Sequence, residues 1–163
     1  MPLRLAKLLL VSSLAAFVFI VAYDNVVDYD SNYEFVRHVL SMDTTFPTNT
    51  LRTRAITNPA LWNAAYIAII TTEALTALAF AKGAYDLLRN LWAPTQRFQA
   101  ARCYTIIGAT LAFLLWFTGF MVIGGEYFSM WQSAIWNGQQ AAFRFYATVL
   151  LVLIVVLQPD QDL

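Results

Sequence analysis

Four long apolar stretches run through this sequence and restrict what it can fold into. They span residues 5–23, 62–81, 104–122 and 141–157. A helix that crosses the hydrocarbon core of a bilayer needs about 20 mainly apolar residues, which is close to the length of each stretch. In lipid the backbone must satisfy its own hydrogen bonds, which favours helices over irregular structure. The sequence therefore predicts an all-α protein, a four-helix transmembrane bundle.

The composition agrees with this class and excludes others. Of the 163 residues, 60% are hydrophobic and 12% are charged, about half the share of charged residues in an average soluble domain. The net charge is zero and the basic residues are scattered, so we expect a lipid bilayer as partner and no nucleic acid. Repeats, low-complexity tracts and a separable soluble segment are absent from the sequence. We predict one integral membrane domain, residues 1–163.

Lysine and arginine predict the orientation in the membrane. Six of them lie at the start of the first stretch and between the second and third stretches: Arg4, Lys7, Lys82, Arg89, Arg97 and Arg102. The connection after the third stretch has no basic residue before Arg144, whereas the first connection holds three arginines against five acids. Basic residues favour the cytoplasmic side, and acids count little in this rule. We expect both termini in the cytoplasm and the first and third connections outside.

The first outer connection contains a short amphipathic segment, "SNYEFVRHVLSM". Helical spacing places Phe35 and Val39 on an apolar face, with Arg37 and His38 on a polar one. Ser31, followed three residues later by a glutamate, is typical of a capping box at a helix start. We predict a short interfacial helix that lies flat on the outer side of the membrane.

The second outer connection, "GGEYFSMWQSAIWNGQQ", combines glycines, aromatic rings and amides. Tryptophan and tyrosine prefer the depth of the lipid headgroups, and the Asn-Gly pair favours a turn before the fourth stretch. We expect this connection to meet the first one and form an outer cap. The candidate outer-cap site consists of His38, Asp43, Glu126, Trp131, Gln132, Trp136, Asn137 and Arg144. These side chains either pin the two loops together or form a pocket for an ion or small molecule.

Glu73 is the ionisable residue placed deepest in a predicted span. It lies nine residues from Lys82, or roughly 13 Å along a helix at 1.5 Å per residue. A charge there costs at least about 2.5 kcal/mol, so we expect hydrogen-bonding partners around it. The candidate intramembrane polar site comprises Glu73 with the hydroxyls of Ser12, Ser13, Thr72 and Thr76. Glu73 is then either a protonated carboxyl that holds the bundle together or, by analogy with small multidrug transporters, a proton-coupled binding site.

Catalytic and metal-binding patterns are sparse in this sequence. It has a single histidine, His38, and a single cysteine, Cys103, too few for a bis-histidine haem or an internal disulfide. No spacing of ligands matches a structural zinc site, and no G-x-S-x-G motif is present. We expect no cofactor, no resident metal and no catalytic residues.

Two segments resemble a known family. "FVRHVLSMDTTFP" and "GGEYFSMWQSAIWNGQQAAFRF" resemble the signature blocks of a bacterial family of predicted small integral membrane proteins, domain of unknown function 2165. The resemblance covers essentially the whole chain and implies a four-span protein of the bacterial inner membrane. It implies no catalytic residues.

These observations leave three functions open. The first is a non-catalytic accessory or assembly subunit of a larger membrane complex, because the chain has little soluble mass and its second span, with Glu73, is only marginally apolar. The second is a small proton- or ion-coupled transporter that uses Glu73. The third is a binding protein whose outer loop cap recognises a lipid or a periplasmic ligand. A foreign partner protein favours the first function, and a homo-oligomer favours the second.

Overall fold

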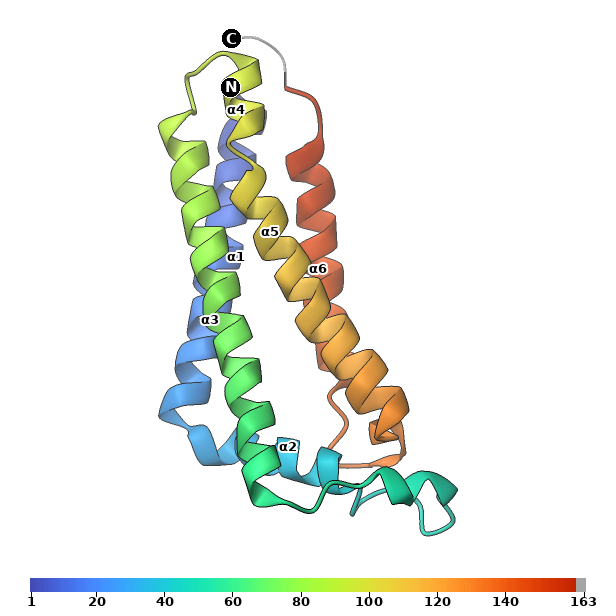
Figure 1. Cartoon of the computed structure of the whole chain (residues 1–163). Helices are drawn as coiled ribbons and strands as arrows, with labels where there is room; N and C mark the ends of the chain where they lie inside the picture. The colour runs from blue at the N-terminus through green and yellow to red at the C-terminus, as the bar shows by residue number, and fades with distance from the viewer. Residues whose placement is uncertain (161–163) are drawn as a thin grey trace.

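Four long helical segments run side by side in the computed structural model, which describes residues 1–160 (Figure 1). They are α1 (Pro2–Val27), α3 (Pro59–Arg89), the run from Thr95 to Tyr127, and α6 (Gln139–Leu157). All four are long and apolar enough to cross a membrane, and the described part of the chain contains no strand. The predicted all-α four-helix bundle is confirmed, and each predicted span lies inside one of these segments.

The third segment is not a single uniform helix. It consists of α4 (Thr95–Ala100), α5 (Cys103–Phe113) and η2 (Leu114–Tyr127). η2 is a π-helix, and it closes with a hydrogen bond from the Phe128 N–H to the Ile123 carbonyl at 3.0 Å. π-Helical turns are rare and occur frequently at functional sites. In Figure 1, η2 diverges from α3 as both approach the end that carries α2.

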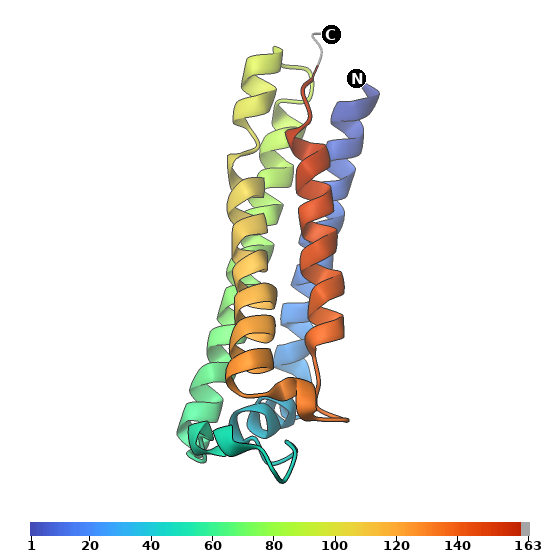
Figure 2. The ribbon, with the colours of Figure 1, turned by 90° about the vertical axis from the view of Figure 1, so that its right-hand side faces the viewer.

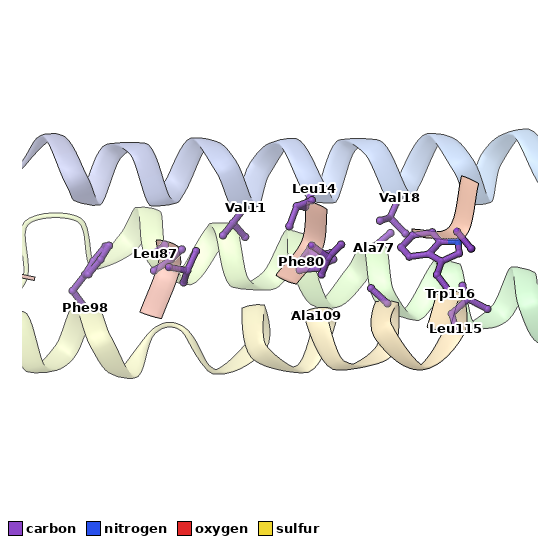
Figure 3. Packing of buried hydrophobic residues seen from close by; sticks show 14 of the residues in the cluster. Val11, Leu14, Val18, Ala77, Phe80, Leu87, Phe98, Ala109, Leu115 and Trp116 are labelled. Atoms are coloured by element: carbon purple, nitrogen blue, oxygen red, sulfur yellow. The ribbon is translucent and has the colours of Figure 1, made fainter. Parts of the chain in front are cut away.

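Large apolar side chains fill the centre of the bundle (Figure 3). Val11 and Val18 of α1 meet Phe80 of α3 and Ala109 of α5, and all four are at most 2% exposed. Small residues bring α3 and α5 close: a Cβ atom added to Gly83 would lie 2.6 Å from Thr105 Oγ1. Such close approach is how helices associate in lipid, where water does not drive them together.

The bundle has two unlike ends. The cap end carries α2 (Tyr29–Ser41), η1 (Thr50–Arg54) and η3 (Met130–Gln132). The terminal end carries Met1, the connection between α3 and α4, and residues 158–160 after α6 (Figure 1). The first and third connections thus lie at one end, as expected for a chain with four successive spans.

α2 crosses the cap end at a steep angle to the four long helices (Figures 1 and 2). It ends where Met42 adopts a left-handed conformation, φ 52°. The predicted start at Ser31 is wrong, because the helix begins at Tyr29 with Asp28 as its N-cap residue and no capping side chain. Asp28 is also the C-cap residue of α1, so α2 begins directly after α1 ends. Ser31 therefore lies inside α2 and cannot cap its start. The position of α2 at a membrane surface stays a prediction.

Candidate functional site

Glu73 has a buried amide as its partner. Asn25 Nδ2 donates a hydrogen bond of 2.7 Å to Glu73 Oε2, and the two residues are 7% and 2% exposed. A carboxyl group removed from water needs such a donor, because an unsatisfied buried polar group costs about 1–3 kcal/mol and a charged one more. This contact joins the end of α1 to the middle of α3.

A small polar network extends from this pair towards α2. Asn25 Oδ1 accepts a hydrogen bond of 2.7 Å from Asn32 Nδ2, and the Tyr66 hydroxyl donates to the Asn25 carbonyl at 3.0 Å. Tyr29 packs on Tyr66 with ring centroids 4.6 Å apart. Residues of α1, α2 and α3 therefore fix the position of Asn25 and, through it, the Glu73 carboxyl.

The hydroxyl partners predicted for Glu73 are wrong. Ser12, Ser13, Thr72 and Thr76 each donate to the carbonyl four residues earlier in their own helix, at 2.7–2.9 Å. The reason is direction: side chains lean towards the N-terminus of their helix, and α1 and α3 run in opposite directions. Ser12 and Ser13 lean towards the terminal end, whereas Glu73 leans towards the cap end, where Asn25 meets it. The hydroxyls of all four residues are thus engaged with backbone carbonyls and not with Glu73.

Glu73 and Asn25 form the polar end of a cavity of about 270 Å³, which we call the polar cavity. Its walls come from all four long helical segments and α2, and include Phe35, Trp116 and Phe145. Apart from Asn25, Asn32, Tyr66 and Glu73, the residues that line it are apolar. An acid that can accept hydrogen bonds therefore faces a largely hydrocarbon-lined space.

A second cavity of about 270 Å³, the apolar cavity, lies beside the first. The two cavities share the side chains of Phe35, Val36, Ile69 and Phe120 as a common wall. η2 contributes Gly119 and Gly124 to the apolar cavity, and α2 contributes Val39 and Leu40. We call the two cavities together the chamber. It lies where α3 and η2 diverge, and α2 covers its cap end.

His38 is the centre of the outer cap. Its ring stacks on Trp136 with centroids 4.5 Å apart and an interplanar angle of 15°. His38 Nδ1 lies 2.8 Å from Asp43 Oδ1, and Arg37 donates to His38 Nε2 at 2.7 Å. A guanidinium can only donate, so Nε2 is the acceptor in this contact, and Nδ1 faces the Asp43 carboxylate. The hydrogen bond from Arg37 to Glu34 raises the pKa of the arginine further above its ordinary value.

Hydrogen bonds tie the two loops of the cap together. Thr44 Oγ1 donates to Ser133 Oγ at 2.9 Å, and the Phe46 N–H donates to Gln132 Oε1 at 3.0 Å. Phe46 also meets Trp131 edge to face, with centroids 5.9 Å apart. These contacts support the reading in which cap residues pin the loops to each other. A ligand site on the outer surface of the cap stays a prediction.

Three of the predicted cap residues lie apart from this cluster. Asn137 Oδ1 accepts from the Gln139 N–H and so serves the start of α6. Glu126 and Arg144 are exposed, and within residues 1–160 neither side chain makes a hydrogen bond or an ion pair. The structure therefore brings together His38, Asp43, Trp131, Gln132 and Trp136 through loop contacts, but not the other three.

Sequence reasoning missed the role of Asn25. The predicted first span ended at residue 23, so Asn25 fell in a loop, whereas α1 continues to Val27. The signal was present in the spacing, because Asn25 extends the buried face that runs through Val11, Val18 and Ala22. A polar residue that continues such a face is expected to meet a polar group on the facing helix.

Comparison with known proteins gives a match over almost the whole chain. Residues 3–159 match the model of a family described as predicted small integral membrane protein (DUF2165). No curated protein and no solved structure matches the chain. The family description adds membrane insertion to the geometry and assigns no activity to the residues of the chamber.

Proposed function

The chain belongs to this family of predicted small integral membrane proteins, and we propose that it is a non-catalytic membrane protein that binds an amphipathic molecule in the chamber. The observation that carries the proposal is the position of Glu73, a buried acid that lies with three other polar residues on the wall of a cavity lined elsewhere by apolar side chains. Ligand sites are typically apolar hollows with a few polar groups that fix orientation. The polar cavity has this composition.

The chamber supports a particular ligand chemistry. Its apolar walls suit an alkyl chain, and its polar end offers a carboxyl group that already accepts a hydrogen bond from Asn25. A head group that donates hydrogen bonds, such as an ammonium or a hydroxyl, complements that carboxyl. A second carboxylate does not, because like charges repel in a medium of low dielectric constant. We propose a long-chain amine or alcohol as the ligand class.

Packing at the terminal half favours binding over transport. Val11, Phe80 and Leu87 are fully buried there, between the chamber and the terminal end. Transport coupled to Glu73 would require a second arrangement of the helices that opens this core. We therefore favour a binding protein over a proton- or ion-coupled carrier.

Dodecylamine binding tests the proposal. Native mass spectrometry of the purified chain should retain dodecylamine, and Glu73→Gln should weaken binding by about tenfold, since a hydrogen bond to a charged group contributes about 1.5–3 kcal/mol. Glu126→Gln is the matched control, because it removes an exposed carboxylate at the same end. Equal losses in the two variants, or equal retention of dodecanoate, would refute the proposal.

An accessory role in a larger complex is the second candidate. A groove of about 560 Å³ lies between α1 and α3, and alanines line much of it: Ala15, Ala16, Ala22, Ala74, Ala77 and Ala81. Small residues let a neighbouring helix approach closely in lipid. We propose that a transmembrane helix of another subunit packs there. Native mass measurement after gentle extraction distinguishes a foreign partner from a homo-oligomer, and a chain that stays monomeric in lipid nanodiscs would argue against both.

The place of the protein in the cell is part of the proposal. We propose the bacterial inner membrane, with both termini in the cytoplasm and the cap outside. The basic residues at the terminal end support this orientation.

A further inference from the structure

Three basic side chains are buried together at the terminal end. Arg4, Lys7 and Arg102 are 2%, 0% and 6% exposed. Arg4 and Lys7 belong to α1, and Arg102 immediately precedes α5. Lysine and arginine are almost never fully buried unless they are paired. Their burial calls for nearby anions.

Among the described residues, one carboxylate contacts this cluster. Asp160, after the end of α6, has a side chain that is 1% exposed and lies 2.9 Å from Lys7 Nζ. It also forms an ion pair with Arg102. Among residues 1–160, no other carboxylate lies within ion-pair distance of Arg4, Lys7 or Arg102. Within residues 1–160, three cations thus face a single anion.

The guanidinium groups of Arg4 and Arg102 lie 4.8 and 5.9 Å from the ring centroid of Phe98, and the remaining hydrogen bonds of the cluster are to neutral oxygens. Arg4 donates to the carbonyls of Leu91 and Ala93 at 3.2 and 2.6 Å, and Lys7 donates to the Gln158 carbonyl at 2.5 Å. The Nε atoms of Arg4 and Arg102 are buried, and within the described chain neither has an acceptor. The cluster therefore has donors and positive charge left over after Asp160 is counted.

We propose that Arg4, Lys7 and Arg102 form a binding site for a phosphate group, and that Asp160 occupies this site when no phosphate is bound. A phosphate group supplies more acceptor oxygens than a carboxylate and can offer acceptors to the unpaired guanidinium N–H groups. Basic pockets between transmembrane helices bind anionic lipid head groups in this way. The source of the phosphate is either a phospholipid at the terminal end or free phosphate in solution.

Competition between Asp160 and the phosphate gives a test. The full chain is titrated with phosphatidylglycerol, with diacylglycerol as the phosphate-free lipid, and separately with inorganic phosphate. Asp160→Asn removes the competing anion and should tighten phosphatidylglycerol or phosphate binding by at least about fivefold, the lower range of typical coupling between sites. Binding of diacylglycerol should not change. Tightening with lipid alone identifies the head group as the source, and tightening with inorganic phosphate identifies the free anion.

Matched variants separate this effect from general electrostatics. Asp86→Asn makes the same charge change on α3, where Asp86 pairs with the exposed Lys82, and should leave phosphate affinity unchanged. Asp160→Glu keeps the charge and should retain wild-type affinity. Lys7→Gln should abolish the preference of the chain for phosphatidylglycerol over diacylglycerol, whereas the exposed Arg97→Gln should not.

Two results would overturn the proposal. One is equal affinity in wild type and folded Asp160→Asn for both phosphate sources. The other needs no variant at Asp160: wild type that shows no preference for phosphatidylglycerol and no binding of inorganic phosphate has no such site.

Discussion

Asn25 and Glu73 show how one side chain can decide the surroundings of another. The hydrogen bond between them is 2.7 Å long, and both residues are buried. A buried acid with a donor can line an apolar cavity, whereas one without a donor destabilises the bundle. The pair therefore stabilises the fold and also supplies the polar end of the chamber.

Replacement of Asn25 tests this dependence. We expect Asn25→Leu to lower the free energy of unfolding by about 1–3 kcal/mol, because Glu73 loses its donor while the shape of the side chain is nearly kept. The midpoint of denaturant-induced unfolding in detergent measures the change. Ser13→Ala is the control and should change stability by less than about 0.5 kcal/mol, since its hydroxyl bonds only to its own helix. A larger loss in Ser13→Ala than in Asn25→Leu would contradict the assignment.

His38 and Trp136 give a second prediction at the level of single residues. His38→Ala removes the stacked ring and the contact with Asp43, and should destabilise the cap by about 0.5–1.5 kcal/mol. Tryptophan fluorescence reports the exposure of Trp136 during unfolding. His38→Phe keeps the ring and should recover most of the loss. If the phenylalanine variant is no more stable than the alanine variant, stacking does not hold the cap.

At the scale of elements, close packing joins α3 to α5. We expect Gly108→Ala to destabilise the bundle by about 1–3 kcal/mol, because its new Cβ would lie 2.9 Å from the ring of Phe80. Gly119→Ala is a matched control on the same helical segment, where the nearest atom would be 4.0 Å away. Thermal unfolding of both variants in the same detergent compares them. Equal losses would mean that helix propensity, rather than packing, sets the effect.

The elements also show what the sequence can and cannot predict. Hydropathy predicts the four long helices, because a backbone in lipid must satisfy its own hydrogen bonds and a helix does so within one segment. Helical spacing predicts α2 from its apolar face at Phe35 and Val39. Residue counts along each helix do not predict the partner of Glu73, since they ignore which way the side chain leans. The π-helical form of η2 was not predicted either, because its residues Leu114–Tyr127 are as apolar as those of an ordinary span.

At the scale of the whole molecule, the chamber arises from the divergence of α3 and η2. The sequence predicted two separate candidate sites, one at Glu73 and one in the outer cap. The candidate cap residues do not line the chamber, but α2, which carries His38, also contributes Phe35 to the polar cavity that Glu73 lines. The tilt between α3 and η2 creates this space. The residue pattern within one helix does not predict how that helix is tilted against another, so the sequence could not predict the chamber.

The orientation of the molecule gives a prediction for intact cells. Cysteines placed at the exposed positions Asp43 and Ala134, in a Cys103→Ala background, should both react with a maleimide that cannot cross lipid. Native Cys103 is exposed near the terminal end and should react only after the cells are permeabilised. Reaction of positions 43 and 134 from opposite sides would be incompatible with a single cap.

The central claim is that the chamber binds an alkyl chain whose polar head reaches Glu73. Trp116 lines the polar cavity and is 2% exposed, so lipid outside the bundle has little access to it. Brominated dodecylamine that enters the chamber should quench the fluorescence of Trp116, measured as the difference between wild type and Trp116→Phe. We predict saturable quenching of this component in wild type, and in Glu73→Gln a shift of the midpoint to about tenfold higher ligand concentration. Quenching that spares Trp116 while it affects the exposed Trp92, or that is unchanged in Glu73→Gln, would contradict the account.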